Sequence, residues 1–185
     1  MRRLNELSPS KQALLAKWAR TGAGSDSGIP LASPGAGPMP LSFVQERQLF
    51  LELLDPLTAV NNLAVCVRLN GPLDVAALEG SANRIIARHE TLRTSFDLSQ
   101  GRAIPRLSLA VTIALGIVDL EKHRADRQVE AVRLAELEAR RPFDLGRAPL
   151  LRAKVLRLGA EEHVLVIVIH HTIADAFADS FKKST

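Results

Sequence analysis

The feature that most constrains the fold is an unbroken run of six apolar residues, 164–169, near the end of the chain. Every member is β-branched or leucine, and a short run of this kind is typical of a central β-strand buried on both faces. The run ends at His170 and His171, and Asp175 follows four residues later. Because side chains alternate across a strand, the two imidazoles are expected on opposite faces. One histidine can then border a cleft while the other packs inside the fold.

Length and composition indicate a globular domain with a real core. The chain has 185 residues, of which 46% are hydrophobic and 24% charged. Its single cysteine, Cys66, excludes an internal disulfide and argues against a cysteine-based metal site. No apolar segment resembles a signal peptide or could span a membrane, so we expect a cytoplasmic protein. The net charge of +4 is concentrated in residues 1–20, and the remainder shows no basic stripe for nucleic acid.

Three regions are expected along the chain. Residues 1–20 contain a helix from about 8 to 20, with Ser8 as its cap and Pro9 in its first turn. This helix either packs on the following domain or docks an upstream partner chain. Residues 21–39 are predicted to be a disordered linker, since five glycines and four prolines fall within residues 21–40. The folded domain is predicted over residues 40–180.

The domain is expected to open with two helices that flank a strand. Ser42 and Gln45 have the spacing of a capping box, which predicts a helix from this point. A strand is predicted over 62–69, and a second helix is predicted from its cap, Asp74, to Arg88. The apolar faces of the two helices are predicted to be Phe43, Leu49, Phe50 and Leu53 in the first, and Val75, Leu78, Ala82, Ile85 and Ile86 in the second.

The second half of the domain is predicted to end in a β-hairpin. Residues 103–118 are β-prone without a clear pattern, and 122–141 are rich in Ala, Glu and Arg, as in a long helix with a solvated face. Strands are predicted over 151–158 and 163–170. The turn at 159–162 joins them.

Two segments carry a resemblance to a known family. Residues 88–96 read RHETLRTSF, and residues 170–176 read HHTIADA. These segments resemble the second core motif and the His-His-x-x-x-Asp-Gly signature of the condensation domains of non-ribosomal peptide synthetases, which belong to the chloramphenicol-acetyltransferase-like superfamily. Ala176 stands where the signature has glycine. The segments around Ser42, Pro142 and Pro149 resemble further motifs of the same family, so the resemblance covers about residues 40–176.

The resemblance implies an α/β fold, an α+β two-layer sandwich of the chloramphenicol-acetyltransferase-like kind. A mixed sheet covered by helices would form this lobe. A full condensation domain has two similar lobes, and this chain would supply the N-terminal lobe only. The segment 177–185 departs from the family pattern and has the look of a truncation or a frameshifted tail.

The same resemblance implies peptide (amide) bond formation between a carrier-bound aminoacyl or peptidyl thioester and an acceptor amine. His171 is the candidate catalytic residue, because an imidazole titrates near neutral pH. It would take a proton from the attacking amine, or it would orient the amine and stabilise the tetrahedral intermediate. The phosphopantetheine arms belong to donor and acceptor carrier proteins, so no cofactor is expected on this chain. Since the C-terminal lobe would be a missing partner, we expect the isolated chain to be inactive.

Four further residues are expected to support the site. Asp175 would form an ion pair with Arg93 or Arg88, although Thr172 and Asp175 also have the spacing of a capping box. His170 would be a packed, hydrogen-bonded histidine. A metal site of His170, His171 and Asp175 is disfavoured, because neighbouring strand residues point apart.

Two other functions remain open from the sequence. The chain could be a free-standing acyltransferase of the same superfamily that uses coenzyme A thioesters. It could also be a non-catalytic fragment that only binds a carrier protein or the second lobe. Ala176 bears on this choice, because its methyl group would narrow a channel where the family has glycine, and a positive φ there would be strained.

Overall fold

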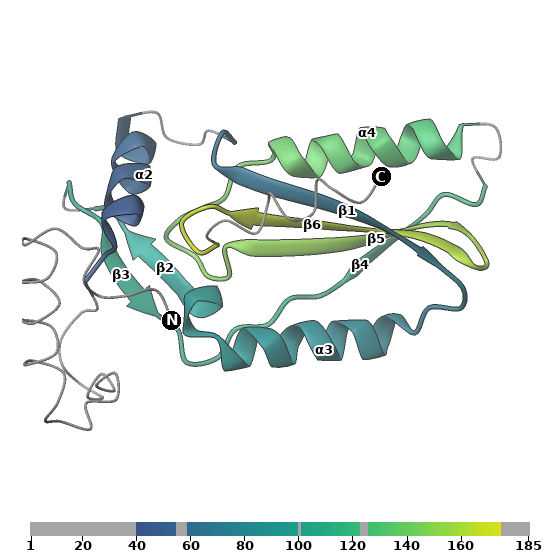
Figure 1. Ribbon diagram of the computed structural model, residues 1–185, viewed down its shortest axis with the longest axis horizontal. Helices are drawn as coiled ribbons and strands as arrows, with labels where there is room; N and C mark the ends of the chain where they lie inside the picture. Colours follow the sequence, from purple (N-terminus) through teal and green to yellow (C-terminus); the bar gives the residue numbers. More distant parts are fainter. Residues whose placement is uncertain (1–39, 55–58, 100, 123–125, 175–185) are drawn as a thin grey trace, which may run out of the picture. The chain divides into compact units, whose positions relative to one another are not determined.

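The computed structural model describes residues 40–54, 59–99, 101–122 and 126–174. The chain divides after Gly37, and all described residues lie in the second unit, Pro38–Thr185. The predictions for the helix at 8–20, the linker at 21–39, the capping box at Asp175 and the tail at 177–185 fall outside the described residues. Figure 1 shows the elements of the second unit.

The described part of the chain contains both helices and strands. In chain order they are α2 (Phe43–Leu54), β1 (Asn62–Asn70), α3 (Val75–Arg88), the short 3-10 helix η2 (Glu90–Arg93), β2 (Thr94–Asp97), β3 (Ile104–Leu107), β4 (Gly116–Asp119), α4 (Arg127–Arg140), β5 (Leu151–Gly159) and β6 (Glu162–His170). The predicted strand at 62–69 and the predicted hairpin are confirmed. The α3 cap is confirmed as well, because the Asp74 side chain accepts a hydrogen bond from the Ala77 N–H at 2.9 Å.

The larger sheet has the strand order β1-β6-β5-β4, and β2 pairs with β3 in a separate ribbon. β6 runs antiparallel to both of its neighbours, whereas β4 runs parallel to β5. The apolar run at 164–169 therefore lies in a strand with a partner on each side. The prediction of a mixed sheet accompanied by helices is confirmed.

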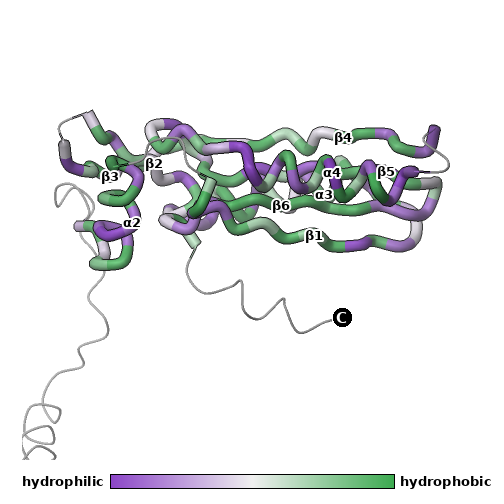
Figure 2. The backbone as a smooth tube through the Cα atoms, turned by 90° about the horizontal axis from the view of Figure 1, so that it is seen from above, coloured by the Kyte–Doolittle hydropathy of each residue, from purple (hydrophilic) through white to green (hydrophobic). Residues whose placement is uncertain are grey.

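The helices α3 and α4 lie on opposite sides of this sheet (Figures 1 and 2). Beneath α4, one buried cluster joins the helix to β5 and β6, and β6 is coloured as apolar along most of its length in Figure 2. Its buried members are Leu120, Ala131, Leu156, Leu158, Val166 and Val168. This cluster packs the sheet against α4 and so fixes the position of β6, including its end.

A second buried cluster forms where β6 ends. It joins Leu49 of α2, Phe96 of β2, Leu145 and Leu150 before β5, and Ile173 after β6. Burial of such side chains contributes on the order of 1.5–3 kcal/mol each. Because its members come from separate segments, this cluster brings α2 against the turn that follows β6.

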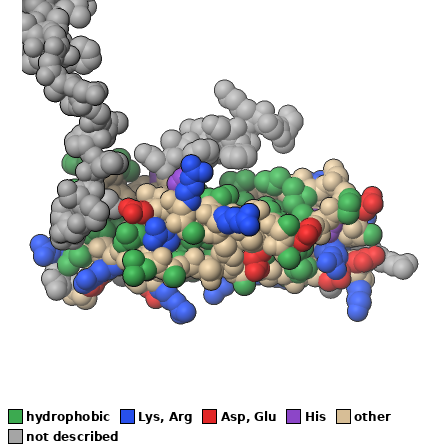
Figure 3. Space-filling model, turned by 90° about the horizontal axis from the view of Figure 1, so that it is seen from below, with side chains coloured by type: hydrophobic (Ala, Val, Ile, Leu, Met, Phe, Trp, Pro, Cys, Tyr) green, Lys and Arg blue, Asp and Glu red, His purple; other side chains and the backbone are tan. Residues whose placement is uncertain are grey.

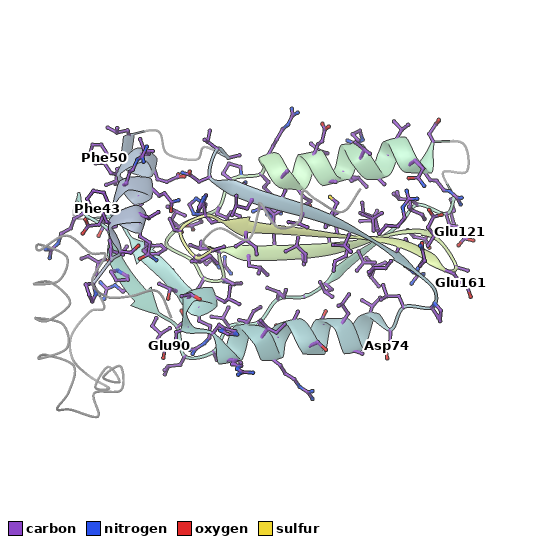
Figure 4. All side chains as sticks on the ribbon, viewed as in Figure 1. Phe43, Phe50, Asp74, Glu90, Glu121 and Glu161 are labelled. Carbon is purple, nitrogen blue, oxygen red and sulfur yellow. The ribbon has the colours of Figure 1, made fainter. Side chains whose placement is uncertain are left out.

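The predicted apolar faces of α2 and α3 are partly wrong. Phe43 is 84% exposed and Phe50 58% exposed, and Ile85 of α3 is 54% exposed. Figure 4 shows Phe43 and Phe50 on the outer side of α2. The physical reason is that α2 packs through the face that carries Leu49 and Glu52, which leaves both phenyl rings outside. On the face of the molecule shown in Figure 3, apolar side chains also lie between charged ones.

The core under α4 yields a stability prediction. Leu156 is 0% exposed and belongs to the buried cluster, so Leu156→Ala should lower the free energy of unfolding by about 2–5 kcal/mol. The control is Leu137→Ala, because Leu137 lies on α4 but is 53% exposed. Urea unfolding followed by circular dichroism measures both. Equal losses in the two variants would contradict this packing.

Candidate functional site

The candidate site is the turn that leaves β6, and hydrogen bonds from two neighbouring segments hold its backbone. The His170 N–H donates to the Leu150 carbonyl at 2.9 Å, and the His171 N–H donates to the Asn61 carbonyl at 2.8 Å. The Ile173 N–H then donates to the His170 carbonyl at 3.1 Å, which closes the turn. The two histidines therefore sit on a backbone that is fixed on both sides of the strand.

His170 is buried, with 1% of its surface exposed. Its Nδ1 lies 2.9 Å from the Thr172 Oγ1, and its Nε2 lies 3.2 Å from the Glu52 Oε1. The ring also meets Phe143 edge to face, with ring centroids 6.0 Å apart. Burial lowers the pKa of His170, and the nearby Glu52 carboxylate opposes this only in part. This is the packed, hydrogen-bonded histidine that the sequence predicts.

His171 is only partly buried and borders a cavity of about 280 Å³. The cavity wall comes from α2, from Thr91 and from the turn after β6; its other members are Ser42, Val44, Gln45, Gln48, Thr172, Ile173 and Ala174. His170 is not part of this wall. The Nδ1 of His171 has no hydrogen-bond partner among the described residues. The two imidazoles thus occupy different environments, as expected from side-chain alternation along the strand.

Gln45 joins α2 to the turn. The Ser42 N–H donates to the Gln45 Oε1 at 3.0 Å, and the Gln45 N–H donates to the Ser42 Oγ at 3.2 Å. This reciprocal pair confirms the predicted capping box. The remaining Gln45 amide group donates through Nε2 to the Thr172 carbonyl at 2.9 Å. One side chain therefore caps the helix and fixes the residue that follows His171.

The two arginines predicted to support the site lie in different surroundings. Arg93 donates from Nη1 to the Ser108 carbonyl at 2.7 Å, and this bond ties the start of β2 to the segment after β3. Arg88 is the last residue of α3, and it is exposed. Asp175 and Ala176 lie outside the described residues, so the ion pair of Asp175 with Arg93 or Arg88 stays a prediction.

Sequence reasoning missed Glu52 and Asn61. Glu52 is 5% exposed, and its Oε1 accepts a hydrogen bond from the Asn61 Nδ2 at 2.7 Å. The sequence did indicate that Glu52 points inward, because it follows Leu49 by three residues and so lies on the same face of the helix. On its other side, Glu52 lines a second, larger cavity of about 650 Å³ together with Phe96 and Phe143.

Comparison with known proteins identifies the family. The model of the condensation domain matches residues 36–179, which is most of the chain. The chain belongs to the condensation domain family. Tyrocidine synthase 2 of Brevibacillus parabrevis is 41% identical over 155 residues, which cover 82% of this chain and 4% of that protein. Phosphinothricin tripeptide synthetase PhsC of Streptomyces viridochromogenes is 35% identical over 179 residues, covering 95% of this chain and 16% of that protein. The condensation domain described here thus spans a small part of each of these relatives.

Solved condensation domains share the fold. The first condensation domain of the calcium-dependent antibiotic synthetase, in complex with a substrate analogue, matches with a TM-score of 0.65 at 26% identity, over 72% of this chain and 32% of that one. A starter condensation domain of rhizomide synthetase RzmA matches with a TM-score of 0.69 at 22% identity, over 76% of this chain and 32% of that one. The chain thus spans about a third of these solved chains. No helix in the described part of the chain is long and apolar enough to cross a membrane.

The buried state of His170 predicts a pH dependence of stability. Its pKa is lowered in the folded state from an ordinary value of 6.5, so the unfolded chain takes up the proton first as the pH falls. Stability should therefore be present above about pH 6.5 and be lost as the pH falls toward the folded-state pKa, by up to about 1.4 kcal/mol per pH unit. Urea unfolding at pH 7.5, 6.5 and 5.5 measures this loss.

The control for that experiment is His170→Asn, which removes the titrating ring. The variant should be less stable at pH 7.5, but its stability should change less between pH 7.5 and 5.5. Parallel pH profiles for the two proteins would contradict a neutral, buried His170.

Proposed function

We propose that this chain is part of a domain that forms an amide bond, with His171 at the reaction centre. The substrates would be an aminoacyl or peptidyl thioester on one carrier protein and an amine on another. The observation that carries the proposal is the position of His171. It lies at the end of a buried strand, beside a cavity, while the neighbouring imidazole is held inside the fold. The family and its synthetase relatives support this assignment.

An imidazole suits both chemical roles considered for this position. As the amine attacks the thioester, a C–N bond forms, and the amine nitrogen must lose a proton. His171 would accept that proton and pass it to the thiolate released by C–S cleavage, so the step yields the amide and a free thiol on the donor arm. General-base catalysis of this kind contributes about 10²–10⁴-fold. Because His171 borders the cavity, its ring is close enough to a group bound there to serve in either role.

The size of the cavity limits what it can hold. At about 280 Å³ it lies near the lower end of small-molecule sites, which span roughly 300–1,000 Å³. It therefore suits the reacting groups at the end of a phosphopantetheine arm rather than a whole carrier protein. Polar groups at its wall, among them Ser42 and Gln48, could orient such groups. The arms themselves would belong to the donor and acceptor carrier proteins.

The rest of the domain is part of the proposal. Because the chain spans about a third of the solved condensation domains, we expect a second lobe to cover the site. Orientation of two substrates can account for about 7–11 kcal/mol of a reaction barrier, and one lobe cannot surround both arms. The chain alone should therefore form little or no product.

A coenzyme A thioester is the second candidate donor. The starter condensation domain of rhizomide synthetase RzmA has been solved in complex with C8-CoA, at 23% identity to this chain. An acyl donor on free coenzyme A would need the same imidazole but no donor carrier protein. Supplying either loaded donor carrier or acyl-coenzyme A to the same preparation separates the two.

The test uses this chain joined to the second lobe of a relative, with loaded donor and acceptor carrier proteins. His171→Ala should lower the rate of amide formation by about 10²–10⁴-fold, as expected for loss of a general base. Mass spectrometry of the acceptor carrier detects the product. The matched control is His89→Ala, because His89 is exposed at the end of α3 and does not border the cavity. Full activity of the His171 variant would refute the proposal.

A further inference from the structure

The carboxylate of Glu52 stands out because it is buried and its one ion-pair partner in the described part of the chain is a histidine. The side chain is 6% exposed, and the basic group within ion-pair distance is His170, at 3.2 Å. No lysine or arginine of the described residues pairs with it. A buried carboxylate is costly unless hydrogen bonds satisfy it. Its place on the inner face of α2 therefore calls for a role other than packing.

Two donors satisfy one oxygen of this carboxylate. The Asn61 Nδ2 lies 2.7 Å from Oε1, and the His170 Nε2 lies 3.2 Å from the same atom. Asn61 comes from the segment before β1, and His170 ends β6. Glu52 thus joins three segments of the chain at one point.

The hydrogen bonds around His170 determine its tautomer. The Thr172 N–H points at the His170 Nδ1 at 3.4 Å, and a backbone N–H can only donate. Nδ1 must therefore be the acceptor, which also suits donation from the Thr172 hydroxyl at 2.9 Å. The proton of the neutral ring then sits on Nε2 and is donated to Glu52.

The same network reaches His171 from both sides. The Asn61 carbonyl accepts the His171 N–H at 2.8 Å, while the Asn61 side chain is held by Glu52. On the other side, Thr172 contacts the ring of His170, and its carbonyl accepts from Gln45. Asn61 and Thr172, which shape the backbone of His171, are therefore bonded to Glu52 directly or through one imidazole.

We propose that Glu52 is a positioning residue for His171. Its carboxylate holds His170 in the Nε2–H tautomer and holds Asn61 in place, and these two contacts fix the turn that presents His171 to the cavity. The catalytic part of this inference rests on the proposed function, whereas the tautomer and the rigidity of the turn do not. Burial of the imidazole lowers the pKa of His170, which agrees with a neutral ring at physiological pH.

The first test is spectroscopic and uses the 185-residue chain. Nitrogen-15 NMR of the wild-type ring should show His170 as the Nε2–H tautomer. In Glu52→Gln, the negative charge is lost, and the remaining amide oxygen is a weaker acceptor for the two donors than the carboxylate oxygen, so the preference for Nε2–H should weaken and the tautomer should become mixed. Exchange of the His171 amide proton should accelerate at least about tenfold, because its acceptor Asn61 is released. Glu46→Gln is the matched control, because Glu46 is an exposed glutamate on the same helix.

Two results of these NMR measurements would overturn the proposal. An Nδ1–H tautomer in the wild-type chain would overturn the proposal, whether or not the variant folds. So would a Glu52→Gln protein whose His170 tautomer and His171 exchange match those of the control. If Glu52→Gln does not fold, Asn61→Ala replaces it, and it should also accelerate His171 amide exchange relative to the control. Unchanged exchange there would refute the link through Asn61.

A kinetic test then addresses positioning in the two-lobe protein. Glu52→Gln should lower kcat at least about tenfold with little change in KM for the acceptor carrier, and Glu46→Gln should change neither. If His171→Ala abolishes activity but Glu52→Gln does not lower kcat, the positioning role fails and the proposed function stands. If His171→Ala keeps full activity, the proposed function fails, and the NMR results alone decide the structural part.

Discussion

The hydrogen-bonded ring of His170 is the constraint on which the arrangement of this site depends. It accepts from Thr172 on one side and donates to Glu52 on the other, inside the protein. An imidazole buried with one nitrogen unpaired would cost about 1–3 kcal/mol, so both bonds contribute to the stability of the turn. The end of β6, the inner face of α2 and the segment before β1 are therefore placed together.

The neighbouring residues His170 and His171 lie in different surroundings. The ring inside the fold is hydrogen-bonded to the turn and to α2, and the ring beside the cavity is the one that the proposed reaction would use. This difference follows from strand geometry, because successive side chains leave a strand on opposite faces. It requires a strand that cannot shift, and β6 meets that requirement through a partner strand on each side and the buried cluster under α4. In the proposed reaction, a small displacement of His171 would lower the rate, since proximity effects depend on geometry.

Features encoded by nearby residues could be predicted from the sequence, and features that depend on distant contacts could not. The central strand, the cap at Asp74 and the Ser42–Gln45 box follow from spacing over a few residues, and the structure contains all three. The exposure of Phe43 and Phe50 could not be predicted, because an amphipathic pattern does not show which face of α2 packs against the core. The same applies to Glu52, whose partners lie 9 and 118 residues away in the chain.

The adjacent histidines occupy different environments, one sealed inside the fold and one open to a cavity. Diethyl pyrocarbonate tests this directly, because it acylates accessible, unprotonated imidazole nitrogens, and fragmentation mass spectrometry distinguishes the two positions. We expect His171 of the folded chain to be modified at a rate comparable with that of the exposed His89, whereas His170 should react only after unfolding. Equal modification of His170 and His171 in the folded protein, or faster modification of His170, would contradict this difference in their environments.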